Sequence, residues 1–132
     1  MHRRSFLKKF HASNPPSHLV SGTKGEEMVH RLLLKRGYRI LERNYRSKLG
    51  EIDIIAMDKE VLVFVEVKSR SNNLYGEPGD FVDKRKQQRI MMTAELFMKQ
   101  HNLTDLQPRF DVAEVYWERG GIRYIQNGFP GF

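Results

Sequence analysis

The stretch VLVFVEVKSR, residues 61–70, constrains the fold of this chain more than any other segment. Its five consecutive apolar residues are mostly β-branched or aromatic, which is typical of a strand buried on both faces. Alternate residues of a strand share a face, so Leu62, Phe64, Glu66 and Lys68 point to one side and the valines to the other. The sequence therefore predicts a buried strand whose C-terminal half carries two neighbouring charges.

A second strand is expected at about 50–57, because this segment is also apolar or alternating and only three polar residues separate it from 61–68. The two segments predict a β-hairpin with its tip at Lys59 and Glu60. This register opposes two pairs, Asp53 with Glu66 and Glu51 with Lys68.

Two carboxylates and an ammonium group thus meet at one end of the predicted hairpin. Opposed like charges destabilise a sheet, and burying an unpaired carboxylate costs on the order of several kcal/mol. Lys68 can neutralise one carboxylate, and the other requires an Arg or Lys from elsewhere, a shifted pKa or a divalent cation. Oxygen ligands favour Mg²⁺ or Mn²⁺. Judged by spacing alone, a strand end that reaches solvent, with Glu51 and Lys68 as an ordinary surface pair, explains the charges slightly better.

The remaining segments predict an α/β fold with the element order α-β-β-β-α-β-β. A first helix is expected between a capping box at Thr23 and Glu26 and a C-cap at Gly37, and a second at about 80–101, where apolar residues recur at helical spacing. Further strands are expected at 38–41, 109–117 and 122–126.

The chain is long enough for one domain, expected at 21–127 between a flexible basic arm at 1–20 and a short tail at 128–132. An acid-free start that contains arginine is also a feature of organellar transit peptides. The absence of cysteine excludes disulfides, thiolate nucleophiles and cysteine-ligated metals. No apolar run of membrane-spanning length is present, so we expect a cytoplasmic protein without a membrane partner.

The net charge of +7 suggests a polyanionic partner, but residues 1–25 carry +5 of it, so any binding face on the domain must be local. Basic residues cluster at 31–48 and in KRKQQR at 84–89. Solvated surface charge explains an isolated run of this kind, but these two clusters flank one carboxylate site. The basic start of the second helix opposes the helix macrodipole, which is understandable if these residues face phosphates. The predicted phosphate contacts are Arg43, Arg46, Lys84, Arg85, Lys86 and Arg89.

Six motifs follow one another along residues 21–127: G-x-x-G-E at 22–26, GYRILERNYR at 37–46, GEIDIIA at 50–56, VFVEVKSR at 63–70, V-D-x-x-K at 82–86 and RFDV at 109–112. In this order they resemble the YraN-like family of the PD-(D/E)XK restriction-endonuclease-like superfamily, to which the archaeal Holliday junction resolvases also belong. Ile52 replaces the proline of the superfamily's PD, as is normal for YraN-like sequences. Gln87 or Gln88 matches a glutamine found on the following helix in some branches, and Gln87 is assigned to nucleic-acid binding on that likeness.

The resemblance implies a restriction-endonuclease-like core, with a mixed central sheet flanked by helices, and metal-dependent hydrolysis of phosphodiesters. By position, Asp53 matches the metal-binding acid, Glu66 the second acid and Lys68 the motif lysine. Glu26 matches a first-helix glutamate that approaches the same metal in the resolvase-like branch. The implied cofactor is Mg²⁺ or Mn²⁺, the implied partner is branched or single-stranded DNA, and the likeness to dimeric resolvases suggests a homodimer.

Three functions stay open at this point: a Mg²⁺-dependent endonuclease, a non-catalytic nucleic-acid-binding module of the same fold, and a partner-binding protein that docks through its basic arm and an exposed FPGF tail. The intact acids and lysine favour the first. No base-reading pattern is present, so contacts should be mainly with phosphates of DNA or RNA. Tyr45, Tyr75 and Phe81 can stack on unpaired bases, although aromatic residues of a small domain are more often core.

Overall fold

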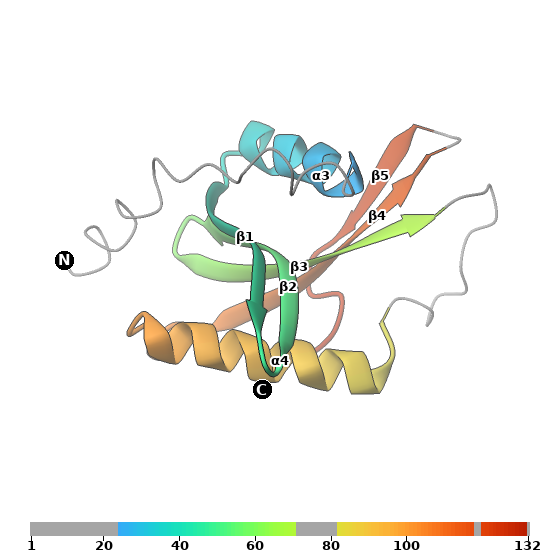
Figure 1. Ribbon diagram of the computed structural model, residues 1–132. Coiled ribbons are helices and arrows are strands. Elements are labelled where there is room, and N and C mark those ends of the chain that lie inside the picture. Colours follow the sequence, from blue (N-terminus) through green and yellow to red (C-terminus); the bar gives the residue numbers. More distant parts are fainter. Residues whose placement is uncertain (1–23, 71–81, 118–119, 132) are drawn as a thin grey trace.

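Five strands form one mixed sheet in the order β1-β2-β3-β4-β5, with a helix on each of its faces (Figure 1). The computed structural model describes residues 24–70, 82–117 and 120–131. β3 and β4 are parallel, and the other neighbouring strands are antiparallel. The predicted fold class and element order are confirmed and are consistent with a restriction-endonuclease-like core. The elements are α3 (Lys24–Lys35), β1 (Arg39–Ser47), β2 (Gly50–Asp58), β3 (Val61–Arg70), α4 (Lys84–Gln100), β4 (Pro108–Tyr116) and β5 (Gly121–Ile125).

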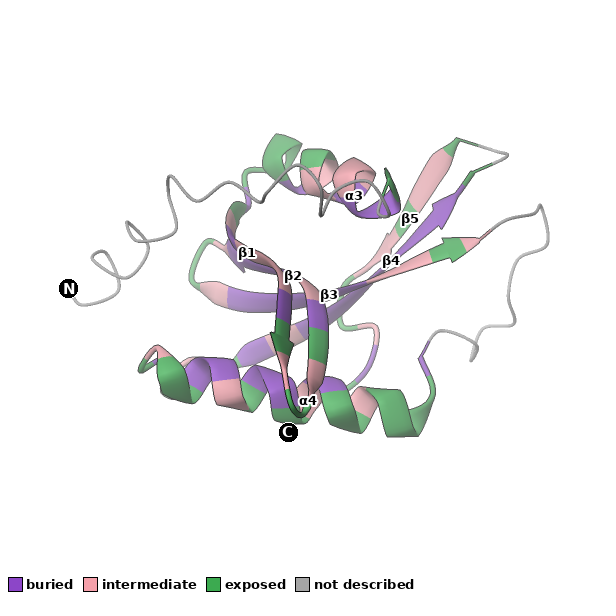
Figure 2. Cartoon of the chain, viewed as in Figure 1, coloured by how far each residue is buried: buried purple, intermediate pink, exposed green. Residues whose placement is uncertain are grey.

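Two apolar cores, one on each face of the sheet, hold the helices in place (Figure 2). Phe97 of α4 packs in one core with Leu62 and Phe64 of β3. Val29 and Leu33 of α3 pack in the other core with the buried valines of β3. The predicted division of β3 into two faces is therefore confirmed. The described part of the chain has no helix that is long and apolar enough to cross a lipid membrane.

The first helix ends as its sequence predicts. Gly37 has a φ of +86°, in the left-handed region that glycine adopts readily. The backbone N–H of Tyr38 donates to the carbonyl oxygen of Leu33 at 2.9 Å, which is the long hydrogen bond of a Schellman C-cap. The predicted partner of the capping box, Thr23, lies outside the described residues.

The second helix begins later than predicted, at Lys84, because Asp83 is its N-cap. The Asp83 side chain accepts a hydrogen bond from the backbone N–H of Lys86 at 2.9 Å. An aspartate just before a helical segment is a signal that could have placed this boundary correctly.

The β2–β3 hairpin has the predicted tip and register, but its ladder is shorter than predicted. Five pairs, from Asp58 with Val61 to Ile54 with Val65, follow the expected register. No described pair continues to Asp53, because β2 and β3 separate there. β2 stays paired with β1, which spans 39–47 instead of 38–41, while β3 runs on beside β4.

The separation coincides with a change of face in β2. Ile52 packs in the core under α4 and Ile54 in the core under α3, although alternate residues of a regular strand share a face. The end of the β1–β2 hairpin bends onto α4 (Figure 1). A Cβ on Gly50 would lie 3.0 Å from Oγ1 of Thr93 in α4, so the two backbones are close. The irregularity places Asp53 at the bend.

The C-terminal segment packs on the domain. Phe129 is buried, and its ring stacks on that of Phe110 with centroids 5.2 Å apart. The backbone N–H of Gly128 donates to the Phe110 carbonyl oxygen at 2.8 Å. The expectation of an exposed FPGF tail is therefore wrong at Phe129, because this ring completes the core under α4. Phe132 lies outside the described residues.

Candidate functional site

Asp53 occupies the gap where the β2–β3 ladder stops. Its Oδ2 accepts a hydrogen bond from the backbone N–H of Val67 at 2.8 Å. A side chain thus takes the acceptor role that a strand carbonyl has elsewhere in the ladder. This contact fixes the Asp53 carboxyl between the two separating strands, next to Glu66.

Glu66 is buried, with 5% of its surface exposed, and its partner comes from α4. Lys86 Nζ lies 2.5 Å from Glu66 Oε2, and the Lys86 side chain is half exposed. Burial lowers the pKa of Lys86, but its hydrogen bond to Glu66 and the charges of Glu66, Asp53 and Glu51 outweigh burial and leave the pKa raised. A basic residue from elsewhere was one of three predicted ways to compensate the second carboxylate, besides a shifted pKa and a divalent cation, and Lys86 is such a residue.

Glu26 reaches the same cluster from α3. It is buried, and burial raises its pKa, while the nearby charge of Arg43 opposes that rise. Glu26 Oε1 is 3.9 Å from a terminal nitrogen of Arg43 and has no hydrogen-bond partner among the described residues. Its pKa also responds to Asp53 and Glu51. A buried carboxylate oxygen is thus left under-coordinated beside Asp53.

The carboxylates influence one another strongly. Burial, and next the negative charge of Glu66, raise the pKa of Asp53 to about 8, and Glu26 contributes to the same rise. The hydrogen bond from Val67 lowers the pKa and only partly compensates. The described structure therefore meets the predicted need for compensation in two ways, with Lys86 on Glu66 and with a proton on Asp53 near neutral pH.

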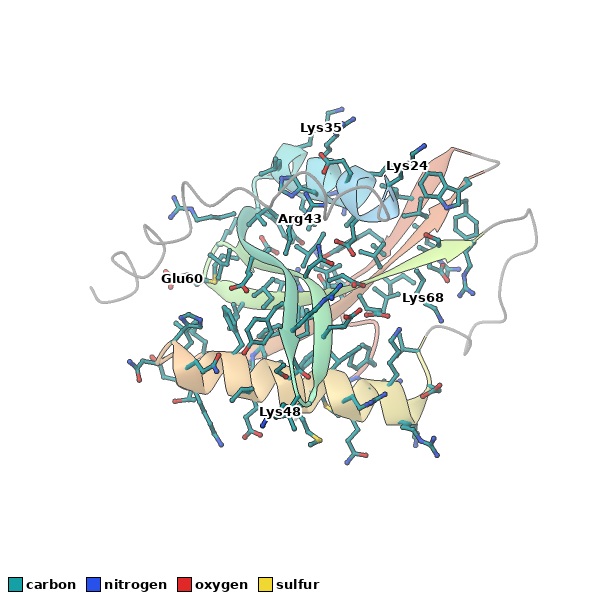
Figure 3. The ribbon with its side chains drawn as sticks, viewed as in Figure 1. Lys24, Lys35, Arg43, Lys48, Glu60 and Lys68 are labelled. Carbon is teal, nitrogen blue, oxygen red and sulfur yellow. The ribbon has the colours of Figure 1, made fainter. Side chains whose placement is uncertain are left out.

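Lys68 lies on the same face as Glu66 and is half-buried. It projects from β3 on the side that faces the start of α4 (Figure 3). Its neighbour in the register is Glu114 of the parallel strand β4. Lys68 therefore projects from the same face of β3 as Glu66, as expected for the lysine of the E-x-K motif.

The predicted cross-strand pair of Glu51 and Lys68 is wrong. Glu51 lies opposite Arg46 of β1, with Oε2 3.4 Å from the Arg46 Nε, and both side chains are largely exposed. The reason is the bend at Asp53, which carries Glu51 toward β1 and α4 while β3 continues beside β4.

The donor set of this site fits a hard divalent cation. Asp53, Glu66 and Glu26 supply only oxygen atoms, the Glu26 Oε1 atom lacks a hydrogen-bond donor among the described residues, and the raised pKa of Asp53 is one that a nearby cation would lower. In the described residues no three acidic or histidine side chains are gathered about one point. Mg²⁺ commonly takes only one or two protein carboxylates and completes its shell with waters and phosphate oxygens.

The α4 residues predicted to contact nucleic acid fall into two groups. Lys84, Arg85 and Arg89 are exposed on the first two turns of α4, which contain no acidic residue in the first turn. Gln87 instead donates from Nε2 to the Val82 carbonyl oxygen at 2.8 Å, so it stabilises the helix start. The first three form an exposed basic face beside Glu66, and Gln87 has a structural duty.

Arg43 is directed into the protein. Its side chain is 5% exposed, and one terminal nitrogen donates to Glu27 Oε1 at 2.9 Å. Figure 3 shows Arg43 beneath α3, and its other terminal nitrogen faces Glu26. The structure thus gives Arg43 the role of counter-charge to the α3 carboxylates. Sequence analysis missed this role because a basic cluster carries no signal of which member is buried.

Two other predicted features also have structural duties. Tyr45 is buried, and its hydroxyl donates to Gln100 Oε1 at 2.7 Å, so it belongs to the core, whereas Tyr75 and Phe81 lie outside the described residues. Arg109 of the RFDV motif donates to Asp111 at 3.0 Å and also to Asp58 and Tyr38. Neither feature adds a group to the carboxylate cluster.

The segment of this chain that matches known proteins includes all the residues of this site. A family model described as Uncharacterised protein family UPF0102 matches residues 25–115. A UPF0102 protein of Caldanaerobacter subterraneus subsp. tengcongensis is 46% identical over 95 residues, which cover 72% of this chain and 78% of that protein. A UPF0102 protein of Clostridioides difficile is 44% identical over 108 residues, covering 82% and 95%. One of Alkaliphilus metalliredigens is 45% identical over 109 residues, covering 82% and 96%.

Proposed function

The chain belongs to the Uncharacterised protein family UPF0102, and because that family brings no activity with it, we propose from the site itself that the protein is a divalent-metal-dependent nucleic-acid hydrolase. This proposal includes the resemblance to YraN-like proteins of the PD-(D/E)XK superfamily. The observation that carries it is the pair of Asp53 and Glu66, two neighbouring carboxyl groups where β2 and β3 separate, with Glu26 of α3 near enough to raise the pKa of Asp53 further.

The energetics of the cluster support a catalytic rather than a structural origin. Removing carboxylates from water and placing them beside one another is costly, and a fold with no use for them would be more stable with neutral residues. Asp53 keeps its place at the cost of a pKa raised to about 8. Strongly perturbed carboxyl groups beside a basic surface are characteristic of functional sites.

In the proposed reaction, Asp53 and Glu66 would hold the cation, and Glu26 would contribute through water. A bound Mg²⁺ or Mn²⁺ supplies charge stabilisation on the scissile phosphate and acidifies a water molecule. Lys68 lies on the same face as Glu66, where its amine can orient the attacking water or accept its proton. Val67 keeps Asp53 in place through its backbone N–H.

The substrate is held mainly through phosphates. Lys84, Arg85 and Arg89 lie on the exposed start of α4, where the first two precede Lys86, the partner of Glu66, and Arg89 follows it by three residues. Their charges suit a phosphate backbone and carry no base-specific information. By analogy with the resolvases, branched or single-stranded DNA is the proposed substrate.

A non-catalytic binding module is the second candidate, and one observation favours it. Glu66 is already neutralised by Lys86, and Asp53 is protonated near neutral pH, so the cluster is electrically satisfied without a metal. Such a module would use the same basic face of α4 without cutting the chain it binds.

Cleavage of labelled single-stranded, flap and four-way DNA in Mg²⁺ or Mn²⁺ separates the two candidates. We expect Asp53→Ala and Lys68→Ala to lower the rate by roughly 10²-fold or more, as loss of an essential catalytic group does. Lys48→Ala is the matched control, because Lys48 is an exposed lysine at the β1–β2 turn. Equal cleavage by all four proteins would indicate a contaminant, and no cleavage with intact DNA binding would favour the module.

A further inference from the structure

Lys86 is the cation of this site in the described structure. Its ammonium nitrogen lies 2.5 Å from Glu66 Oε2, and Glu66 is buried while Lys86 is 54% exposed. A buried carboxylate gains most from a close charge, because little water is present to screen the pair. The same burial makes the site poor at holding two cations at once, so a second one must displace the first.

The ammonium group of Lys86 is at the end of a flexible side chain and is not enclosed by other residues in the described part of the chain. The backbone of Lys86 is fixed by the Asp83 N-cap, but about half of its four-carbon side chain is exposed to water, which leaves the side chain room to rotate. Lys84 lies two residues earlier in the same turn and is also exposed, and its side chain has no hydrogen bond or ion pair within the described residues. Lys86 is thus distinguished from its basic neighbours by its bond to Glu66.

We propose that Lys86 is a positioning residue that occupies Glu66 in the metal-free protein and is displaced when a divalent cation binds. This inference rests on the proposed function and adds that Lys86 and the divalent cation compete for Glu66. The displaced ammonium group stays on the first turn of α4, where it joins Lys84 and Arg85 on the basic face. Cation entry therefore converts an internal ion pair into a free positive charge facing the substrate phosphates.

Competition makes a prediction opposite to that of a structural ion pair. If Lys86 only stabilises the fold, its removal loosens Glu66 and leaves metal affinity unchanged or lower. If Lys86 competes, its removal frees Glu66 and raises metal affinity. A general increase in negative potential would act equally when Lys84 is removed, so Lys84→Met is the matched control for charge.

The experiment is calorimetric titration of the full chain with Mn²⁺ alone, at fixed pH and salt. Lys86→Met keeps the apolar stem and should bind Mn²⁺ about tenfold more tightly than the wild type, the effect of about 1.4 kcal/mol of relieved competition. Lys86→Arg restores a competing charge and should return the affinity to within about threefold of wild type. Lys84→Met, the control, should also bind Mn²⁺ within about threefold of the wild-type affinity. Circular dichroism confirms that each variant is folded.

Other outcomes overturn the inference and separate its failure from that of the proposed function. Wild-type binding that is lost in Asp53→Asn, with no gain in Lys86→Met, would leave the metal site standing and refute competition. An equal gain in Lys84→Met would assign the effect to general electrostatics and also refute it. No Mn²⁺ binding by wild type or by Lys86→Met would refute both the metal site and the competition.

Discussion

Asp53 Oδ2 accepts a hydrogen bond from the backbone N–H of Val67 at the point where β2 and β3 part. The contact needs an acceptor but no charge, whereas the raised pKa of Asp53 arises from burial and from the charge of Glu66. An asparagine at this position can accept the same hydrogen bond and carries no charge. Asp53→Asn therefore keeps the hydrogen bond that Asp53 makes in the fold and removes the free-energy cost of burying its charge.

Asp53→Asn is expected to stabilise the metal-free protein at alkaline pH. The pKa of Asp53 is raised from 3.8 to about 8 in the folded state, so the folded wild type retains a proton that the unfolded chain releases. The stability from this group is complete below pH 4 and is lost as the pH rises toward 8. The variant lacks this loss, so its advantage should grow from near zero at pH 4 to roughly 5 kcal/mol at pH 9, because each unit of pKa difference corresponds to about 1.4 kcal/mol.

Urea unfolding in the presence of a chelator, at intervals from pH 4 to pH 9, measures this difference. Glu51→Gln is the control, because Glu51 is an exposed carboxylate on the same strand. A constant or shrinking advantage of Asp53→Asn with rising pH would contradict a raised pKa.

Arg43→Met is expected to destabilise the fold, because it leaves the buried Glu26 without its counter-charge. The two groups are 3.9 Å apart, and the Arg43 side chain is almost fully buried. Removing one partner of a buried pair costs about 3–5 kcal/mol. Glu26→Gln in the same chain removes the orphaned charge, so the double variant should be more stable than the sum of the two single changes predicts.

The matched control for Arg43 is Arg46→Met on the same strand. Arg46 is exposed and pairs with the exposed Glu51 at 3.4 Å, so its loss should cost less than about 1 kcal/mol. Denaturant midpoints of the wild type, the three single variants and the double variant test this contrast. Similar midpoints for Arg43→Met and Arg46→Met would mean that Arg43 reaches solvent, as the original assignment to phosphates assumed.

The sequence predicts best where local chemistry decides the structure. The valine run, the tip at Lys59 and the cap at Gly37 each follow from nearest-neighbour preferences, and the structure confirms them. The partners of the charges could not be predicted in this way. Lys86 and Glu66 are distant in sequence and meet only because α4 packs on one face of β3, which strand periodicity alone does not reveal.

The bend in β2 shows the same limit. Extending a regular hairpin past Ile54 gives a pair of Glu51 and Lys68, but the strand changes face at Asp53 and the pair does not form. GEID contains no glycine or proline at the bend itself, so the sequence has no local marker for it. The close packing of Gly50 against Thr93 of α4 is a tertiary contact that favours the bend.

Phe129→Ala is expected to destabilise the protein by about 3 kcal/mol or more, because the ring is buried and stacks on Phe110. Pro130→Ala, at the exposed neighbouring position, should change the free energy of unfolding by less than about 0.5 kcal/mol. Urea unfolding compares the two. A negligible effect of Phe129→Ala would restore the reading of an exposed tail.

The basic start of α4 should determine how strongly nucleic acid binding depends on salt. Lys84 and Arg85 are exposed beside the carboxylate cluster, whereas Lys99 is in the last turn of the same helix, paired weakly with Glu95 at 3.9 Å. Each lost phosphate contact lowers the slope of log affinity against log salt by about 0.7 for a single strand. Lys84→Gln and Arg85→Gln should each show this change, and Lys99→Gln should not.

Fluorescence anisotropy of a labelled single-stranded oligonucleotide, titrated at several salt concentrations with a chelator present, measures these slopes without cleavage. The full chain is used throughout, so the N-terminal basic residues contribute equally to every variant. Equal slopes for Lys84→Gln and Lys99→Gln would place the binding surface away from the start of α4. The chelator removes divalent cations and so prevents cleavage. A reduced slope in Lys84→Gln and Arg85→Gln would therefore assign phosphate binding to the start of α4 whether or not the site cuts its substrate.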